Sequence, residues 1–139
     1  DKDVAVEVRK YLDQIDVIDR GYFGKDRQKQ IKQIMDKSIS LLDQKPIDLI
    51  QNKKEKADML YLRGKTLDYN PEYTKLAEEN LSKSIKLMPT KKEAWDALGH
   101  VYWKKQDLHQ SKKCFEGSLE QDEKNKNALR NLSMVYRQL

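Results

Sequence analysis

The segment Lys92-Glu-Ala-Trp-Asp-Ala-Leu-Gly-His-Val-Tyr-Trp-Lys-Lys105 decides how this chain folds. Its tryptophan, leucine, glycine and tyrosine stand three, one and three residues apart, a spacing that places them on one side of a helix. The pattern Trp95, Leu98, Gly99, Tyr102 recurs 34 residues later as Leu129, Leu132, Ser133, Tyr136, and 35 residues earlier as Leu60, Arg63, Gly64, Leu67. A fixed period of this length is typical of a solenoid, in which repeated helix pairs stack on one another.

A second set of positions repeats with the same shift. Ala77, Leu81 and Ser84 recur as Ser111, Phe115 and Ser118. Residues 92–125 therefore form one complete repeat that closely resembles the tetratricopeptide (TPR) consensus. The sequence predicts an all-α, right-handed solenoid of antiparallel helix pairs. Its units are a helical hairpin cap over 1–53, repeats over 54–90 and 91–124, and the first helix of a third repeat over 125–139.

The residue types in this pattern have a packing role. Gly64 and Gly99 remove a side chain where the helices of a pair cross most closely, although glycine costs a helix about 1 kcal/mol. Small residues on the second helices are expected to accept large side chains from their neighbours. We therefore assign Trp95 and Tyr102 to the core, and leave Trp103, one residue away, as a candidate contact for a ligand.

Helix ends and the N-terminal hairpin are predicted from local signals. Thr90 with Glu93, and Asp107 with Gln110, have the spacing of capping boxes, and Asp26 is a plain N-cap. Two apolar stripes at spacings of three and four predict the hairpin helices: Val4, Val8, Tyr11, Leu12, Ile15 and Ile18, then Ile31, Ile34, Met35, Ser38, Ile39 and Leu42. We expect residues 21–24 to form the turn between them, Pro46 to end the second helix, and the chain to resume at about Asp48.

Composition excludes several functional classes. The uninterrupted apolar stretches are only a few residues long, against the roughly 20 that a membrane span needs, so we expect a soluble chain. The one cysteine, Cys114, fits a reducing compartment and is interpreted as a structural thiol. Phosphate-loop, zinc-protease and nucleophile-elbow motifs are absent, and His100 and His109 are expected on different helices. We expect no enzyme, cofactor, metal site or small-molecule substrate.

The inner face of such a solenoid is lined by the first helix of each pair, so ligand-binding residues are sought there. Counting along the repeat gives this set: Tyr61, Lys65, Glu93, Asp96, His100, Trp103, Lys104, Asn127, Arg130, Met134 and Arg137. The mixture of charges with large amphipathic side chains suits a short peptide. A clamp for chaperone tails is not expected, because its positions hold Tyr61, Lys65, Ala97, Asn127 and Asn131, and at most one charge survives.

Three longer sequence segments make the resemblance more specific than the general TPR consensus. Glu93 to Asp107, Leu81 to Leu87 and Asn131 to Leu139 closely resemble the tetratricopeptide repeat protein 5 family, also called Strap, a stress-responsive activator of a histone acetyltransferase coactivator. The resemblance covers residues from about Lys56 to Leu139 well and the N-terminal hairpin loosely. It identifies the chain as the N-terminal TPR portion, without the family's further repeats and OB-fold domain.

The resemblance implies an adaptor with cytoplasmic and nuclear roles. In the cytoplasm it would recognise the N-terminal peptide of nascent tubulin at the ribosome and promote decay of tubulin mRNA, which is tubulin autoregulation. In the nucleus it would scaffold a stress-response transcription coactivator complex. The family's peptide-binding arginine falls on Arg137 and a ribosome-facing lysine on Lys86, which with Lys83 shares one helix face.

Other functions stay open beside this one. The formal charge of +5 is spread over helices that interleave Lys with Asp and Glu, which is typical of solvated surfaces. A generic TPR protein-interaction module is the first alternative. An RNA-binding protein that acts alone ranks below it, since Lys75, Lys83 and Lys86 could contact phosphates without reading sequence. An enzyme ranks last.

Overall fold

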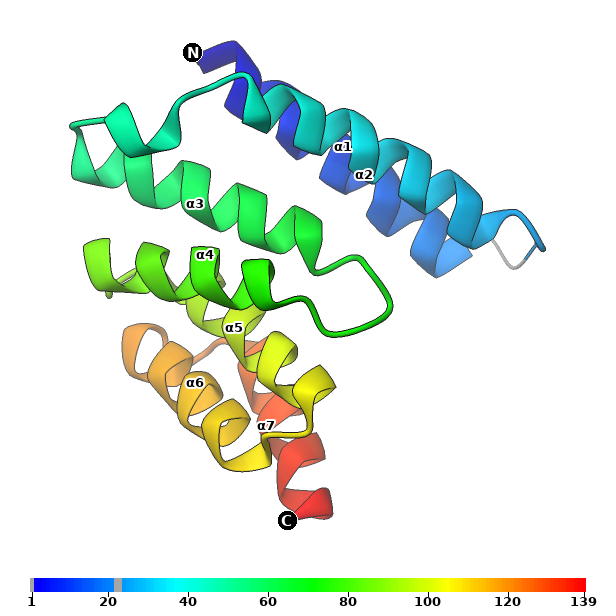
Figure 1. Cartoon of the computed structure of the whole chain (residues 1–139). Helices are drawn as coiled ribbons and strands as arrows, with labels where there is room; N and C mark the ends of the chain where they lie inside the picture. The colour runs from blue at the N-terminus through cyan, green and yellow to red at the C-terminus, as the bar shows by residue number, and fades with distance from the viewer. Residues whose placement is uncertain (1, 22–23) are drawn as a thin grey trace.

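The computed structural model describes residues 2–21 and 24–139, all of whose regular elements are helical. In chain order they are α1 (Lys2–Gly21), α2 (Arg27–Asp43), the short 3-10 helix η1 (Ile47–Leu49), α3 (Lys53–Leu67), α4 (Lys75–Leu87), α5 (Lys92–Lys105), α6 (Leu108–Gln121) and α7 (Lys126–Gln138). Figure 1 shows them stacked from the N-terminus at one end to the C-terminus at the other.

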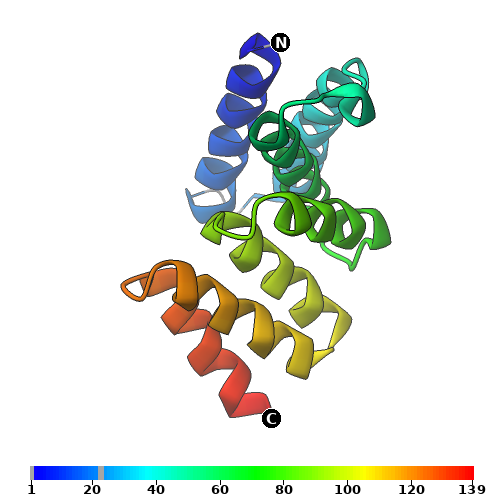
Figure 2. The same cartoon turned by 90° about the vertical axis from the view of Figure 1, so that its left-hand side faces the viewer.

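The helices pair in sequence order. α1 packs on α2, α3 on α4 and α5 on α6, and α7 packs on α6 at the end of the stack (Figures 1 and 2). The first helices also touch along the stack, α1 with α3, α3 with α5 and α5 with α7. In the described part of the chain, no such contact joins α2 to α4 or α4 to α6. The predicted all-α solenoid of helix pairs is confirmed.

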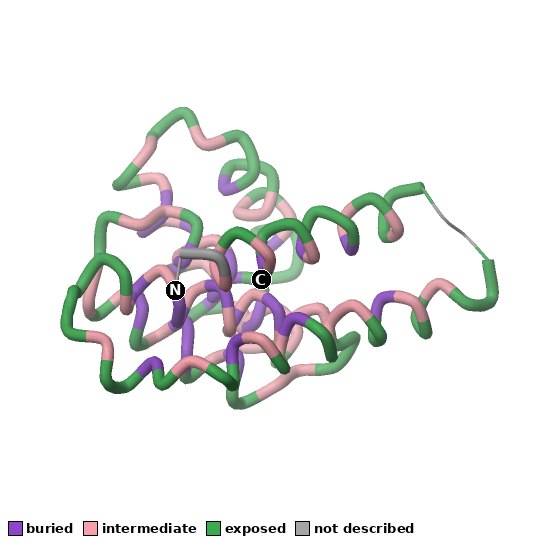
Figure 3. Tube along the Cα trace, turned by 90° about the horizontal axis from the view of Figure 1, so that it is seen from above, coloured by how far each residue is buried: buried purple, intermediate pink, exposed green. Residues whose placement is uncertain are grey.

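Two apolar clusters form the core, and buried residues lie along the interior of the stack (Figure 3). The first joins the N-terminal hairpin to α3, through residues such as Ile15, Leu42 and Leu62. The second joins α4, α5 and α6, and Trp95 and Tyr102 pack against it from the side. The predicted packing roles of Trp95 and Tyr102 are therefore confirmed, although both side chains are only partly buried.

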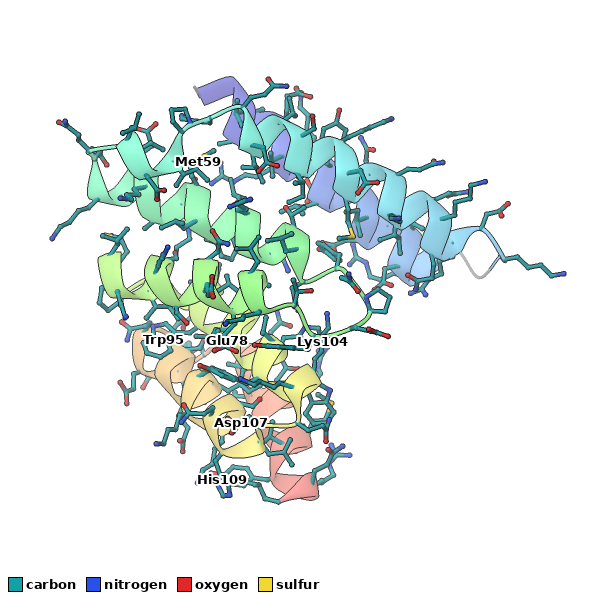
Figure 4. All side chains as sticks on the ribbon, viewed as in Figure 1. Met59, Glu78, Trp95, Lys104, Asp107 and His109 are labelled. Carbon is teal, nitrogen blue, oxygen red and sulfur yellow. The ribbon has the colours of Figure 1, made fainter. Side chains whose placement is uncertain are left out.

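Glycine is required where helices of a pair cross. A Cβ added to Gly64 would lie 2.6 Å from Leu81, and one added to Gly99 would lie 2.7 Å from ring carbons of Phe115. Both close approaches were predicted from the repeat. A third was not: a Cβ at Gly117 would lie 2.7 Å from the Trp95 ring, which therefore rests on the backbone of α6. Trp95, labelled in Figure 4, also donates from its Nε1 to the carbonyl of Pro89 at 2.7 Å.

Buried serines join the second helices to the first. Ser84 donates to the carbonyl of Ala57 at 2.7 Å, and Ser111 donates to the carbonyl of Gly99 at 2.8 Å. Such a bond contributes about 1 kcal/mol net. The small residues of the repeat thus make room for neighbouring side chains and also satisfy their own polar atoms.

The helix ends agree with the sequence only in part. Asp107 caps α6 by accepting from the backbone N–H of Gln110 at 3.2 Å, and Asp26 is the N-cap of α2 without a side-chain bond. The predicted capping box of Thr90 with Glu93 is wrong. Thr90 lies in a turn after Pro89, and the backbone N–H of Lys91 donates to Met88, so α5 begins only at Lys92 and its N-cap is Lys91.

Unpredicted asparagines cap two other helices. Asn52 accepts from the backbone N–H of Glu55 at the start of α3, and Asn125 accepts from those of Asn127 and Ala128 at the start of α7. After Pro46 the chain forms η1, and α3 starts at Lys53, later than the predicted restart near Asp48 and one residue before the expected repeat boundary.

The N-terminal hairpin follows its two apolar stripes. Val8, Leu12 and Ile15 of α1 and Ile31 and Leu42 of α2 are buried in the first cluster. Of the predicted turn, Gly21 ends α1, whereas Tyr22 and Phe23 lie outside the described residues.

Candidate functional site

The inner face of the stack contains a hollow of about 530 Å³, which we call the groove. Its walls come mainly from the first helices, together with the start of α2 and the connection between α3 and α4. The lining residues are Asp16, Asp19, Gln28, Ile31, Tyr61, Lys65, Asp68, Tyr69, Asn70, Pro71, Glu93, Asp96, Ala97, His100, Lys104, Asn127 and Asn131.

The α3–α4 connection, residues 68–74, is fixed to α5 by one aspartate. Lys104 donates to a carboxylate oxygen of Asp68 at 2.9 Å, to its backbone carbonyl, and to the carbonyl of Asn70 at 2.7 Å (Figure 4). The other carboxylate oxygen lies 2.6 Å from Nδ1 of His100. The Asp68 carboxylate is only 11% exposed and the Lys104 side chain only 14%, so their bond is shielded from water and holds the connection in place, whereas His100 is exposed.

Asp96 is the groove carboxylate whose pKa is shifted by burial. Burial raises the pKa of Asp96, and the hydrogen bond from Asn125 opposes that rise. Asn125 donates to Oδ2 of Asp96 at 2.8 Å. The second oxygen, Oδ1, is buried and has no hydrogen-bond partner among the described residues. The groove therefore contains a carboxylate whose charge is incompletely compensated.

Two tyrosines line the same face. Tyr69 donates its hydroxyl to Asp16 of α1 at 2.5 Å, which fixes the connection at a second point. Burial is the main cause that raises the pKa of Tyr61 and of Tyr69 above the ordinary tyrosine value, so both phenols are neutral. Lysine ammonium groups lie over both rings, Lys91 at 4.7 Å from the Tyr61 centroid and Lys65 at 5.3 Å from that of Tyr69. These rings are thus already in contact with cations.

The groove is acidic although the chain is basic. Its lining contains five carboxylates, on Asp16, Asp19, Asp68, Glu93 and Asp96, against two lysines, while the whole chain has a formal charge of +5. Two of the carboxylates are paired, Asp68 with Lys104 and Asp19 with Arg27, so Asp16, Glu93 and Asp96 remain beside Lys65. The field in the groove therefore favours a cation.

The structure brings together some of the residues expected at the site. Asp96, His100 and Lys104 line the groove, as do Tyr61, Lys65, Glu93 and Asn127. Trp103, Arg130 and Met134 do not line it. Trp103 is partly buried at the end of α5, where its carbonyl accepts from the side chain of Gln106 at 3.0 Å.

Arg137 lies on a different hollow. With Leu129, Leu132, Ser133 and Tyr136 it surrounds about 430 Å³ on the outer side of α7. Leu129 and Tyr136 are half exposed there. These two positions correspond by the repeat to Trp95 and Tyr102, which pack against α6 and the second cluster. The role of Arg137 as a peptide contact stays a prediction.

Sequence reasoning missed the contribution of the N-terminal hairpin and of the connection. Asp16 and Asp19 lie at the end of α1, and Asp19 stands four residues after Ile15, where the apolar stripe would continue. The repeat count begins at α3 and does not reach these positions. Tyr69, Asn70 and Pro71 lie where the repeat carries its one extra residue. That insertion was the available signal, because an extra residue in a connection often changes what the loop contacts.

The predicted basic row lies away from the groove. Lys83 and Lys86 are both exposed on α4, one turn apart, and neither lines the groove. A ligand in the groove and a surface that contacts Lys83 and Lys86 would therefore use different sets of residues.

The structure offers little for catalysis in its described parts. Residues 2–21 and 24–139 contain no group of three or more side chains able to hold a metal ion. His100 and His109 lie on α5 and α6 as expected. Burial raises the pKa of Cys114 to about 12, so its thiol stays protonated and packs as a small apolar group. Within the same described ranges, none of the helices is long and apolar enough for a bilayer crossing.

Solved structures with a similar fold are TPR domains. The first TPR domain of Spaghetti (RPAP3), bound to an HSP90 peptide SRMEEVD, superposes with a TM-score of 0.68 at 17% identity, over 97% of this chain and 89% of that one. The second TPR domain of human RPAP3, in complex with an HSP70 peptide, gives a TM-score of 0.56 at 17% identity, over 96% and 98% of the two chains. At this identity the likeness shows the fold alone.

Curated relatives give the family. A scan against protein-family models found no match. Tetratricopeptide repeat protein 5 from Bos taurus is 37% identical over 99% of this chain and 32% of its own length, and the Homo sapiens protein is 42% identical over 81% and 24%. This chain thus spans about a third or less of its relatives. By these matches and its repeat structure, the chain belongs to the tetratricopeptide repeat protein 5 family.

Proposed function

We propose that this chain is a peptide-binding adaptor whose ligand lies in the groove. The observation that carries the proposal is the groove itself, about 530 Å³ on the inner face, with polar side chains supplied by four successive first helices. An extended peptide exposes a backbone donor or acceptor along its whole length, and a row of carboxylate, amide and ammonium groups can satisfy them. We assign no catalytic role to it.

The ligand we propose is the N-terminal peptide of nascent tubulin, recognised at the ribosome to promote decay of tubulin mRNA. Family membership supports this proposal, together with the arginine that the family pattern places at Arg137. That arginine lies at the end of the stack rather than within the groove, so a peptide that contacts both would run along α7. In this role the protein acts in the cytoplasm, and a nuclear role in a stress-response coactivator complex would use the same solenoid as a scaffold.

Lys83 and Lys86 are proposed as the ribosome-facing residues. Both side chains are exposed, and neither is used by the groove. Ammonium groups contact RNA phosphates without reading sequence, and their contribution weakens with added salt. This arrangement would leave the groove open to the emerging peptide while the outer helix contacts the ribosome.

Chaperone tails are a second class of ligand, since both TPR domains of similar fold hold peptides that end in Glu-Glu-Val-Asp. The charges of this groove argue against them. An acidic tail would meet Asp16, Glu93 and Asp96, whereas the nearby cations Lys104 and Arg27 are already paired with Asp68 and Asp19. Like charges brought together across an interface disfavour binding.

Titration calorimetry with three peptides tests the proposal. The probes are a tubulin N-terminal peptide, its scrambled version and the acidic peptide SRMEEVD, measured on this chain and on a family protein of full length. We expect binding of the tubulin peptide in preference to both others. Equal heats for tubulin and scrambled peptides would overturn the tubulin assignment, and tight binding of SRMEEVD would assign the groove to chaperone tails.

A further inference from the structure

A second hollow, which we call the α2 hollow, lies beside the groove between α2 and the α3–α4 connection. It encloses about 910 Å³, and its lining comes mainly from residues three and four apart on α2. Ile31, Met35 and Ile39 form an apolar strip along its floor. The rim is polar: Gln28, Lys32, Asp36, Ser40, Asp43 and Gln44 from α2, and Asn70 from the connection, with Leu67, Tyr69 and Pro71 completing the wall.

The α2 hollow stays open because hydrogen bonds to α5 and α1 hold the α3–α4 connection away from it. α2 and α3 meet at Ser38 and Thr66, whose hydroxyl oxygens are 3.3 Å apart, and α3 ends one residue after Thr66. Beyond it the connection is fixed to α5 through Asp68 and to α1 through Tyr69. Since both bonds draw the connection toward the inner face, it does not fold back over the apolar strip of α2.

The groove and the α2 hollow share a wall. Gln28, Ile31, Tyr69, Asn70 and Pro71 line both. A peptide lying among the carboxylates of the groove therefore comes, at this wall, to the edge of an apolar site of nearly twice the groove's volume.

We propose that the two hollows form one bipartite site, which takes a peptide with a Lys or Arg side chain and, a few residues away, a bulky apolar side chain. The inference rests on the proposed peptide-binding function and deepens it by naming the ligand's chemistry. The cationic side chain lies among the carboxylates of α1 and α5, and the apolar one lies on Ile31, Met35 and Ile39.

Charge complementarity supports the cationic part. Of the lining carboxylates, Asp68 is paired with Lys104 and Asp19 with Arg27, which leaves Asp16, Glu93 and Asp96 beside Lys65. Oδ1 of Asp96 has no partner among the described residues. A guanidinium or ammonium group would offset charge that the chain itself leaves unbalanced. Continuity supports the apolar part, because the strip of α2 begins at Ile31, a residue of the groove itself.

Selection of random peptides tests the inference. Peptides of about twelve residues, which extend over about 40 Å, are displayed on phage and selected on the intact chain. We expect the recovered sequences to combine Lys or Arg with Leu, Ile, Met or Phe at a recurring separation. Recovered peptides without that combination would overturn the inference and leave peptide binding intact. Recovery no better than on empty beads would overturn both the inference and the proposed function.

Variants then assign each half of the site, using a recovered peptide as the probe. Ser40→Glu adds a charge on the exposed rim of the α2 hollow, and Met35→Glu adds one on its floor. The double variant Glu93→Gln with Asp96→Asn removes two groove charges. We expect each change to weaken binding about tenfold. The control Gln33→Glu adds a charge at an exposed position of α2 that lines neither hollow, and should leave binding unchanged.

The variants in which peptide affinity falls show whether the peptide occupies one hollow or both. Replacing the peptide's apolar residue by Ala should cost affinity on the parent chain but not on Ser40→Glu, which circular dichroism should show to be folded. Unchanged affinity in Ser40→Glu and Met35→Glu, with loss only in the groove variant, would overturn the bipartite site. Amide NMR shifts confined to α1, α3, α5 and α7 would do the same.

Discussion

The ring of Phe115 occupies the space that a side chain at Gly99 would need, because a Cβ there would lie 2.7 Å from two ring carbons. Gly99→Leu should therefore destabilise the chain by about 1 to 3 kcal/mol or more, the range typical of overpacking. Thermal unfolding followed by circular dichroism measures the change. Gly21→Leu is the matched control, since no described residue lies within 4 Å of a Cβ at this exposed position. Equal melting temperatures for the two variants would contradict the assigned helix crossing.

Asp96 should make stability depend on pH in a specific sense. Burial raises the native pKa of Asp96, so the native state binds this proton more tightly than the unfolded chain. Its contribution to stability is present below the ordinary aspartate pKa, about 3.9, and is lost as the pH rises through the raised native value. Relative to the parent, Asp96→Asn should gain stability from about pH 4 toward neutrality. Urea unfolding at both pH values measures it, and a constant difference would exclude this role.

Lys83 and Lys86 should matter for ribosomes and not for stability. The double change Lys83→Glu with Lys86→Glu should weaken co-sedimentation with ribosomes and make it less salt-dependent, because fewer phosphate contacts remain. The matched control is Lys113→Glu with Lys124→Glu, which changes charge equally at two exposed lysines on and after α6. If both double variants co-sediment alike, the proposed surface on α4 is wrong.

Arg137 should anchor the tubulin peptide through two parallel hydrogen bonds, a geometry that lysine does not reproduce. Arg137→Ala and Arg137→Lys should therefore weaken binding to a similar extent, roughly 10- to 150-fold for a charged hydrogen bond of about 1.5 to 3 kcal/mol. Calorimetry should use a family protein of full length, since α7 presents Arg137 beside a half-exposed Tyr136. Parental affinity in both variants would show that Arg137 is not a ligand contact.

The fold was predictable because its information is periodic. Gly64 and Gly99 hold the same position in successive repeats, and each makes the close approach that the pattern predicts. Ser84 and Ser111 stand at small-residue positions of the pattern, and each also makes a backbone hydrogen bond that the pattern does not predict. Gly117 has no counterpart in that pattern, so its contact with the Trp95 ring became visible only in the structure. Capping at Thr90 was predicted wrongly because the turn after Pro89 delays the helix, which is a feature of one connection and not of the repeat.

The groove was less predictable, because part of its lining does not follow the repeat. Its central residues, such as Asp96 and His100, follow from counting along α5. Its walls depend on where the α3–α4 connection goes, and that path is set by bonds from Asp68 to Lys104 and from Tyr69 to Asp16. Those pairs join residues 36 and 53 positions apart with no periodic relation, so a sequence without homologues does not reveal them.

The contacts between units differ on the two sides of the stack. First helices touch one another from α1 to α7, whereas in the described chain the outer helices α2, α4 and α6 make no such contacts among themselves. Each outer helix packs instead on the first helix of the next unit, α2 on α3, α4 on α5 and α6 on α7. A change in the angle between units therefore has to shift that contact, but no row of contacts between outer helices opposes it. A ligand that spans several units would act on this angle, and small-angle scattering with and without the ligand would measure the resulting change in superhelical curvature.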